Sequence, residues 1–365
     1  MESSITVECL TSLSEFETVR DEWEAFILRY FPQSYAKTHA WLCAWWATYH
    51  EDQDALVFIG RDAARGKIVA AAPLFIRHDN FGGFPVRMLQ SLGRGLGSDD
   101  FLLSPGTADF TAAVFGRLGR KWDVATFYRV SAEGLLLHCN SLRCFVSQVD
   151  QKETDDFYLD IPDSYRGYLK SRSSKFRNNL LQGIRRLEEE GGISLEVLDP
   201  FKEPERVWEL CGAVARQSWQ FKEGVSHFTE KKAASFYGNL AATGKGAGGE
   251  EFLVLLAGNK PFAFLFGCKR GRSYFLIDTA YDARYRNYSV GRVLFAMTIE
   301  RLIEMGDVNR FYLEGGGDYK DHFATTAQTV HFLALYNRSP YAWSIRLLRR
   351  SRLYRLLKSR GSSHA

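Results

Sequence analysis

A short segment near the C-terminal end gathers side chains that could exchange protons or stabilise charge. Leu313–Phe323 reads LEGGGDYKDHF, in which Glu314 precedes three glycines that are followed by Asp318, Tyr319 and Lys320. Carboxylates act as proton acceptors in active sites, and phenols or ammonium groups stabilise developing negative charge. Successive glycines cost backbone entropy, which favours a close approach to the main chain or a positive φ angle. The alternative is a wide surface turn in which Asp318 and Lys320 form an exposed ion pair.

A second segment has the pattern of a phosphate-binding helix start. In DARYRNYSVGRVLF, apolar residues recur at helical spacing from Val290 onward, and Ser289 stands where an N-cap residue belongs. Gly291 then lies in the first turn, where amides without a partner inside the helix can bind a phosphate or pyrophosphate. Positive charge would come from three arginines: Arg284, Arg286 and Arg292. The alternative is a helix that begins this way without a ligand.

The order of elements connects the two segments. A strand that ends at Tyr281 is followed by this glycine-containing loop, the helix, and a second strand at Asn309–Glu314. Two neighbouring strands in this order can separate and admit a cofactor between them. The glycines after Glu314 would then open the mouth of a cleft toward which Asp318, Tyr319 and Lys320 turn.

In a third segment, the order of the charges is opposite to the one that the helix dipole favours. SSKFRNNLLQGIRRLEEEGG is predicted to be a helix, with apolar residues spaced 4, 4 and 3 apart at Phe176, Leu180, Ile184 and Leu187. Its bases come early and its acids late, although the dipole favours the opposite order by about 1 kcal/mol. The early bases, which are Arg172, Lys175 and Arg177, either hold an anionic ligand near a cleft or form a solvated helix face.

The elements that position these residues occur twice along the chain. Ala55–Asp62 and Lys67–Arg77 read as a hairpin of apolar strands, and Glu251–Gly258 and Pro261–Arg270 repeat that hairpin. Such self-similarity indicates duplication of a mixed α/β unit. The polar stretch Gln151–Asp156 is the predicted seam between the two copies.

Composition indicates the number of domains, the location of the protein and whether it binds a metal. The 365 residues are 45% hydrophobic and 25% charged, which is ordinary for a globular protein of two domains. No apolar run approaches 18 uncharged residues, and the start of the chain lacks a signal-peptide pattern, so we expect a cytoplasmic protein. The 6 Cys and 8 His form no cluster at metal-ligand spacing, so we expect no metal.

The C-terminal end is basic. The residues after Asp321 contain 8 Lys and Arg and no acid, which gives them a charge of +8 and leaves −4 on the rest of the net +4. These bases alternate with apolar residues, as in an amphipathic helix that contacts an anionic membrane surface. The alternative is a terminal helix docked on its own domain with a solvated basic face.

Together these segments resemble a known family. SSKFRNNLLQGIRRLEEEG, RQSWQF around Trp219, YDARYRNYSVGRVLF and FYLEGGGDYKDHF are similar, in their order, to the BioF2-like or CelD-like acetyltransferases of the GNAT superfamily, which are related to the Fem aminoacyltransferases. The resemblance spans about Phe157 to Tyr336. It implies an α/β fold of tandem GNAT-like lobes, each with a central, mostly antiparallel sheet flanked by helices. The corresponding domains would be an N-terminal lobe at 1–152, a C-terminal acetyltransferase domain at 153–340 and a basic amphipathic tail at 341–365.

The resemblance also implies residue roles. The family's phosphate loop corresponds to Arg286, Tyr288, Ser289, Val290, Gly291 and Arg292, with Tyr288 and Ser289 standing where glycine-rich backbone is expected. Lys320, with Tyr319 as a second donor, would stabilise the oxyanion or the leaving group, and Asp318 or Glu314 would accept the proton. Three further residues would hold or line the site of an anionic acceptor: Lys175, Arg177 and Trp219. The alternative for Trp219 is a side chain that fills the core.

Three functions follow as hypotheses. The first is transfer of an acyl group from acyl-CoA, commonly acetyl-CoA, to an amine or hydroxyl of a sugar or amino sugar in exopolysaccharide or cell-envelope synthesis. The second is Fem-like transfer from an aminoacyl-tRNA, although the basic C-terminus alone does not favour a nucleic-acid partner. The third is a non-catalytic GNAT scaffold that assembles with partners at the membrane through its tail.

Overall fold

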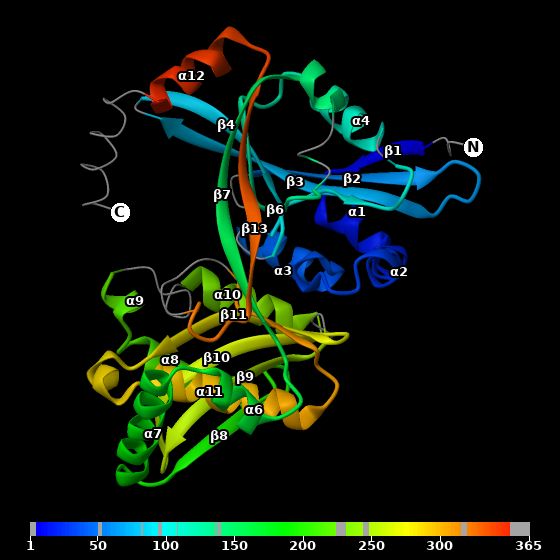
Figure 1. The fold of residues 1–365 in the computed structure, drawn as a ribbon. Coiled ribbons are helices and arrows are strands. Elements are labelled where there is room, and N and C mark those ends of the chain that lie inside the picture. Colours follow the sequence, from blue (N-terminus) through cyan, green and yellow to red (C-terminus); the bar gives the residue numbers. More distant parts are fainter. Residues whose placement is uncertain are drawn as a thin grey trace. The chain divides into compact units, whose positions relative to one another are not determined.

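The computed structural model describes residues 5–49, 53–81, 83–93, 97–107, 109–134, 136, 140–223, 231–243, 248–314 and 320–350 (Figure 1). The chain forms two compact units. Unit 1 comprises Met1–Phe31, Ala36–Thr154 and Thr329–Ala365, and unit 2 comprises Pro32–Tyr35 and Asp155–Gln328. Two predicted site residues, Asp318 and Tyr319, lie outside the described residues, as do 351–365 of the basic tail.

The compact units end differently from the predicted domains at the C-terminal side. The first unit boundary falls after Thr154, close to the predicted one, but it lies inside strand β7 (Val146–Asp160) and not in a polar linker. Residues 329–350, which the sequence assigns to the second domain and the tail, lie in unit 1 because strand β13 (Thr326–Asn337) pairs with β6 (Val124–Ser131). Local patterns do not reveal this long-range pairing.

Unit 1 is built on a mixed sheet. Its strands lie in the order β1 (Ile5–Leu10), β2 (Gln53–Asp62), β3 (Ile68–Phe81), β4 (Phe84–Ser91), β6 and β13. Adjacent strands are antiparallel except for β4 and β6, which are parallel. The predicted hairpin is the β2–β3 pair, and the short β5 (Leu102–Leu103) adds to β3.

Helices cover both faces of this sheet. They are α1 (Leu13–Thr18), α2 (Arg20–Tyr30), α3 (His39–Tyr49), α4 (Asp109–Leu118) and α12 (Pro340–Arg350). Leu74 of β3 lies in one core cluster with Phe110 of α4, whereas the neighbouring Phe75 contacts Trp45 of α3 with ring centroids 4.8 Å apart. Because successive strand residues face opposite sides, a strand covered on both sides reads as a continuous apolar run.

Unit 2 repeats this arrangement. Its strands lie in the order β8 (Ile193–Leu198), β9 (Glu250–Ala257), β10 (Lys260–Arg270), β11 (Ser273–Tyr281), β12 (Arg310–Tyr312) and β7. Only β11 and β12 are parallel. The predicted second hairpin and the strand that follows it are β9, β10 and β11.

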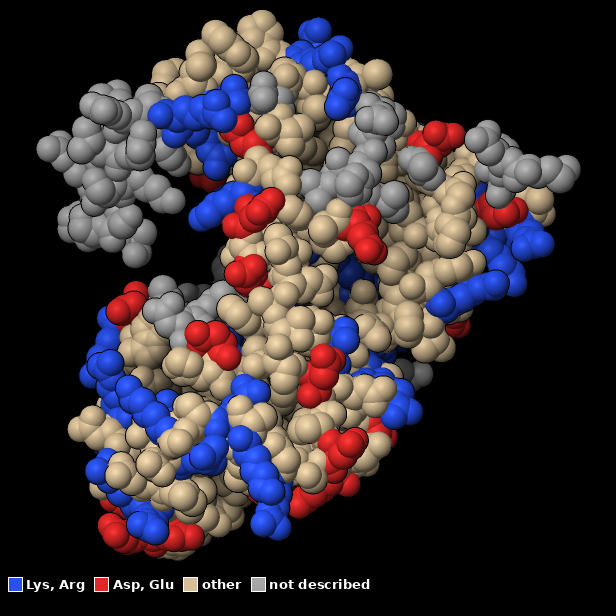
Figure 2. Space-filling model, in the orientation of Figure 1, with Lys and Arg blue, Asp and Glu red and all other residues tan. Residues whose placement is uncertain are grey.

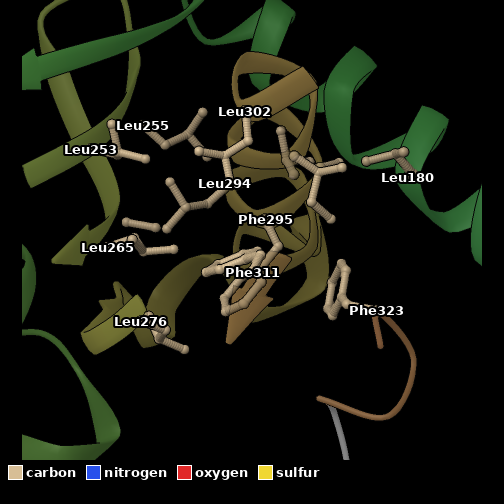
Figure 3. Close-up of a cluster of buried hydrophobic side chains, with 14 of the residues drawn as sticks. Leu180, Leu253, Leu255, Leu265, Leu276, Leu294, Phe295, Leu302, Phe311 and Phe323 are labelled. Atoms are coloured by element: carbon tan, nitrogen blue, oxygen red, sulfur yellow. The ribbon is translucent and has the colours of Figure 1, made fainter. Parts of the chain in front are cut away.

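Two groups of helices flank the second sheet. The helices α6 (Tyr165–Ser171), α7 (Ser174–Glu189) and α11 (Val290–Met305) share a core with one face, while α8 (Pro204–Ala215) and α10 (Lys231–Ala242) cover the other, where Tyr237 contacts Phe252 and Phe266. Figure 3 shows the first core, in which leucines of β9 and β10 face α11 and Phe323 lies beside Phe295. This packing fixes α11 against the sheet.

The two sheets correspond strand by strand. Each contains three antiparallel pairs, then one parallel pair, then a sixth antiparallel strand, which is β13 in unit 1 and β7 in unit 2. The predicted fold class, a mixed α/β fold of two similar lobes, is therefore confirmed. Each sixth strand is reached from the other half of the sequence, so the duplicated lobes are interlaced along the chain.

The described part of the basic C-terminal end is a helix docked on unit 1. Ala342 and Ile345 of α12 are buried, and Arg346 and Arg350 form ion pairs with Asp150 at 2.8 and 2.9 Å. Trp343 and Leu347 lie one turn apart and are 54% and 45% exposed. None of the helices that the structure describes is long and apolar enough to span a membrane.

Candidate active site

A cavity of unit 2 lies where β11 ends and α11 begins. Its volume is about 650 Å³, and it is lined by Trp219, Gln220, Thr279, Ala280, Tyr281, Arg286, Ser289, Val290, Gly291, Arg292, Phe295, His322 and Phe323. Aromatic and aliphatic side chains form its interior, and arginines stand at the α11 end. The cavity lies at the start of α11, where the sequence predicts a phosphate-binding helix end, and we refer to it as the slot.

The slot exists because β11 and β12 pair over only three residues. Ser273–Phe275 pair with Arg310–Tyr312, and the later part of β11 has no further strand on that side among the described residues. A β-bulge at Ile277 interrupts the pairing of β11 with β10. Bulges leave a residue unpaired and often lie next to active sites.

A side chain replaces part of the missing strand. Gln220, in helix α9 (Trp219–Lys222), donates a hydrogen bond from Nε2 to the carbonyl oxygen of Thr279 at 3.0 Å. The Oε1 atom of Gln220 is buried and has no hydrogen-bond partner in the structure. Because a buried polar atom without a partner is costly, Oε1 is an acceptor that a ligand amide could satisfy.

The start of α11 points free amides toward the slot. The helix begins at Val290 as predicted, but Ser289 does not cap it with its side chain, because its backbone is left-handed with φ 54° and ψ 33°. Gly183 of α7 packs here so closely that a Cβ would lie 2.5 Å from the carbonyl oxygen of Tyr288. The amides of Val290 and Gly291 have no acceptor within the described chain, which leaves them available for an anion.

The three arginines predicted for the phosphate loop have different surroundings. Arg284 is held by Asp282 at 2.6 Å and is not among the residues that line the slot. Arg286 lines the slot and is exposed. Arg292 lines it as well, with its guanidinium 5.3 Å from the Phe176 ring centroid and its buried Nε without a hydrogen-bond partner in the structure. Burial lowers the pKa of Arg292, although an arginine remains cationic at neutral pH.

The candidate catalytic residues lie where the two strands separate. Glu314 follows β12 by two residues and has a positive φ of 45°, an uncommon conformation for a residue other than glycine. Its Oε2 accepts a hydrogen bond from Tyr35 at 3.1 Å. The Tyr35 ring contacts Phe275, the last residue of β11 that pairs with β12, with centroids 5.1 Å apart. The Nζ atom of Lys320 donates to the Glu314 carbonyl oxygen. The structure thus brings together Glu314 and Lys320, two of the four predicted catalytic residues.

Of the other predicted residues, one lines the slot and two form hydrogen bonds to neighbouring elements. Trp219 lines the slot and is 45% exposed. Tyr288 turns away, because its hydroxyl donates to Glu190 at 3.2 Å. Arg177 donates to the carbonyl oxygens of Leu169 and Arg172, so it caps the end of α6.

Lys175 lines a second pocket, of about 320 Å³, which shares Arg292 and His322 with the slot. This smaller pocket is lined by Ser171, Arg172, Ser173, Lys175, Phe176, Asn179, Arg292 and His322. Figure 2 shows that blue Lys and Arg side chains are spread across the visible face of unit 2, with red acidic side chains among them and at its lower end. Among the residues that the structure describes, no group of His, Cys, Asp or Glu could hold a metal ion.

Some site residues are absent from the sequence-based expectations. Gln220 lies within the RQSWQF segment and Thr279 lies two residues before Tyr281, but nothing in their spacing indicates a side-chain bond to an open strand edge. Tyr35 is 279 positions from Glu314 in sequence, and no local pattern could connect them. His322 lies two residues after Lys320 and could have been included from that proximity alone.

Comparison with known families agrees with this geometry. Residues 174–323 match the family described as Acetyltransferase (GNAT) domain, a range that runs from the start of α7 through the slot to Phe323. No curated protein matches the chain in sequence.

Solved structures show the same fold over nearly the whole chain. FemX is similar with a TM-score of 0.58 and 9% identity, covering 93% of this chain and 99% of that one. The C-terminal domain of a putative lysylphosphatidylglycerol synthetase from Agrobacterium fabrum has a TM-score of 0.51 and 14% identity, covering 92% and 95%. L-PGS from Bacillus licheniformis has a TM-score of 0.51 and 15% identity, covering 90% and 96%. Residues 174–323 are therefore similar to the GNAT acetyltransferase domain family, and the fold over nearly the whole chain is the one that these solved structures share.

Proposed function

We propose that unit 2 transfers an acetyl group from acetyl-CoA to an amine or hydroxyl of a sugar or amino-sugar acceptor, in exopolysaccharide or cell-envelope synthesis. The observation that carries the donor is the slot, with an unpaired strand edge along one wall and free helix amides at its end. The acceptor class is supported by the resemblance of the sequence to CelD-like acetyltransferases.

The slot residues fit the parts of acyl-CoA. The amides of Val290 and Gly291, with Arg286 and Arg292, suit a pyrophosphate, because a helix N-terminus and guanidinium groups both favour anions. The open edge of β11 and the free Oε1 of Gln220 suit the amide groups of the pantetheine arm. An arm that follows β11 from its end at Tyr281 would bring the thioester to the separation point near Glu314.

Glu314 is the proposed proton acceptor. In the reaction a C–N or C–O bond forms at the thioester carbonyl, the C–S bond breaks, and CoA leaves as the thiolate that later gains a proton. Glu314 would take the proton of the attacking amine or hydroxyl, and Tyr35 would orient its carboxylate. Lys320, held beside Glu314, would stabilise negative charge on the carbonyl oxygen or on the sulfur.

Transfer would be direct, without an acyl-cysteine intermediate. Unit 2 contains Cys211 and Cys268, and burial raises the pKa of both thiols well above the ordinary value. A thiol is a nucleophile only as thiolate, so neither cysteine suits acyl transfer.

Ligand-dependent thermal unfolding tests this proposal. A ligand that binds only the folded state stabilises it by about 2.7 kcal/mol at 100 times its Kd, so acetyl-CoA is expected to raise Tm by several degrees. Nucleotide sugars and amino sugars are then added singly and together with CoA, which identifies the acceptor class. If no CoA ester changes Tm, the proposed donor is wrong.

Turnover assays separate the other two functions. Product formed from a charged tRNA, but not from acetyl-CoA, would establish the aminoacyl-transferase function of the Fem relatives. Absence of turnover with every donor and of binding to every CoA ester would leave the scaffold function.

We also propose that α12 contacts an anionic membrane surface. Trp343 and Leu347 are exposed on the helix face away from unit 1, and each basic residue near an anionic surface contributes about 1 kcal/mol. The protein is expected to co-sediment with vesicles containing phosphatidylglycerol, and Trp343→Ser should reduce the bound fraction. Leu28→Ser, at a residue of α2 that is 67% exposed, is the matched control. Equal binding by Trp343→Ser and the unaltered protein would remove α12 from the contact.

A further inference from the structure

The pocket of about 320 Å³ beside the slot is lined by cations and by no carboxylate. Arg172, Lys175 and Arg292 contribute side chains to its wall, and no aspartate or glutamate is among its lining residues. Within the described part of the chain, none of these three cations forms an ion pair with an acid. The pocket therefore concentrates uncompensated positive charge.

Two of the cations are fixed in place. Arg172 donates through Nη1 to the carbonyl oxygens of His322 and Ala324 at 3.3 and 3.1 Å, and through Nε to Ser171 at 3.2 Å. These acceptors are neutral, so they orient the guanidinium without cancelling its charge. Arg292 lies over Phe176 with its buried Nε unpartnered in the structure, which is an orphaned donor at the wall. A polar atom in that state is stabilised when a ligand supplies an acceptor.

The helix that borders the pocket adds to the positive potential. Helix α7 begins at Ser174, and the Ser173 hydroxyl accepts the Phe176 amide at 3.1 Å. The partial positive charge of this helix end lies beside Arg172 and Lys175, an arrangement that the dipole disfavours by about 1 kcal/mol. An anion bound in the pocket would be attracted both to this helix end and to the two bases, and that attraction would offset the repulsion between them. This accounts for the position of the bases early in the segment.

We infer that this pocket binds a phosphate monoester carried by a ligand of the transfer reaction. The inference rests on the proposed function, since the pocket shares Arg292 and His322 with the slot. The phosphate is either the 3′-phosphate of acyl-CoA or a phosphate on the acceptor. Both present a dianion to guanidinium and ammonium donors, which form the stronger, charge-assisted hydrogen bonds.

A charge-neutralising variant of Lys175 tests the pocket. Lys175 is exposed, so Lys175→Gln should fold normally, and Lys170→Gln removes an equal charge from an exposed position of α6 outside the pocket. The first readout is the binding of inorganic phosphate alone, by calorimetry. Lys175→Gln is expected to weaken it about tenfold, the equivalent of one charge-assisted bond, while Lys170→Gln leaves it unchanged. Equal phosphate affinity in all three proteins would overturn the inference, whether or not acetyl-CoA binds.

The second readout identifies the source of the phosphate. The Kd of acetyl-CoA is compared with that of its 3′-dephospho form in the same three proteins. A preference of the unaltered protein for acetyl-CoA that disappears in Lys175→Gln assigns the pocket to the donor. Equal Kd values for the two donors, together with loss of inorganic phosphate binding in Lys175→Gln, assign it to the acceptor.

Discussion

Replacing Glu314 with Gln is expected to lower turnover by about 10²- to 10⁴-fold, the usual contribution of a general base. Gln keeps the size of the side chain and can still accept a hydrogen bond from Tyr35, but its amide cannot take a proton from the attacking group. The measurement is the steady-state rate with acetyl-CoA and the acceptor identified by thermal unfolding. The Kd of acetyl-CoA should change little, because Glu314 is not among the residues that line the slot.

Two companion variants make this result interpretable. Tyr35→Phe removes the 3.1 Å hydrogen bond to Glu314 and retains the ring contact with Phe275, so an intermediate loss of turnover is expected. Glu188→Gln, on an exposed face of α7, controls for the loss of one acidic charge. Turnover of Glu314→Gln within twofold of the unaltered protein would exclude Glu314 as the base.

Placing a negative charge at Gly291 is expected to weaken acetyl-CoA binding by about 10- to 100-fold, which corresponds to about 1.4–2.8 kcal/mol. Asp at this position would stand among the first amides of α11, where we place the pyrophosphate. The same Asp suits the helix dipole, which favours acids in the first turn by about 0.3–1 kcal/mol. The Gly291→Asp protein should therefore fold at least as stably as the unaltered one, and its loss of affinity can be measured by calorimetry.

Gly291→Ala separates charge from volume. A Cβ added at Gly291 would come no closer than 3.9 Å to Tyr281, an ordinary contact, and the φ angle of Gly291 is not positive. Affinity for acetyl-CoA should therefore stay within a few-fold in Gly291→Ala. If Gly291→Asp also keeps its affinity, the pyrophosphate does not bind at the start of α11.

Much of the fold could be predicted because local patterns specify it. The apolar runs of β2, β3, β9 and β10 lie beside short polar turns, and such runs form hairpins whichever helices cover them. The start of α11 at Val290 followed from its apolar spacing. The order of strand, loop, helix and strand then indicated that β11 and β12 are neighbours that can separate, and their pairing in the structure is parallel.

What could not be predicted depends on contacts between distant segments. The alternation of side chains along β13 is the same whether it completes one sheet or the other, so its sequence does not identify β6 as its neighbour. The left-handed backbone of Ser289 lies where Gly183, which belongs to helix α7, packs against the carbonyl oxygen of Tyr288, and no local pattern indicates this contact. The bond between Tyr35 and Glu314 depends on how the whole of unit 2 is assembled.

The position of β13 in the sequence affects the order in which the two units can fold during synthesis. Unit 2 occupies one nearly continuous stretch, Asp155–Gln328, whereas unit 1 takes its last strand from Thr329 onward. All six strands of unit 2 have been synthesised before β13 is complete, so unit 2 can close its sheet first. Unit 1, although it is translated earlier, must wait with the edge of β6 uncovered. Such an edge can pair with other chains, and this interval of synthesis is when a chaperone would matter most.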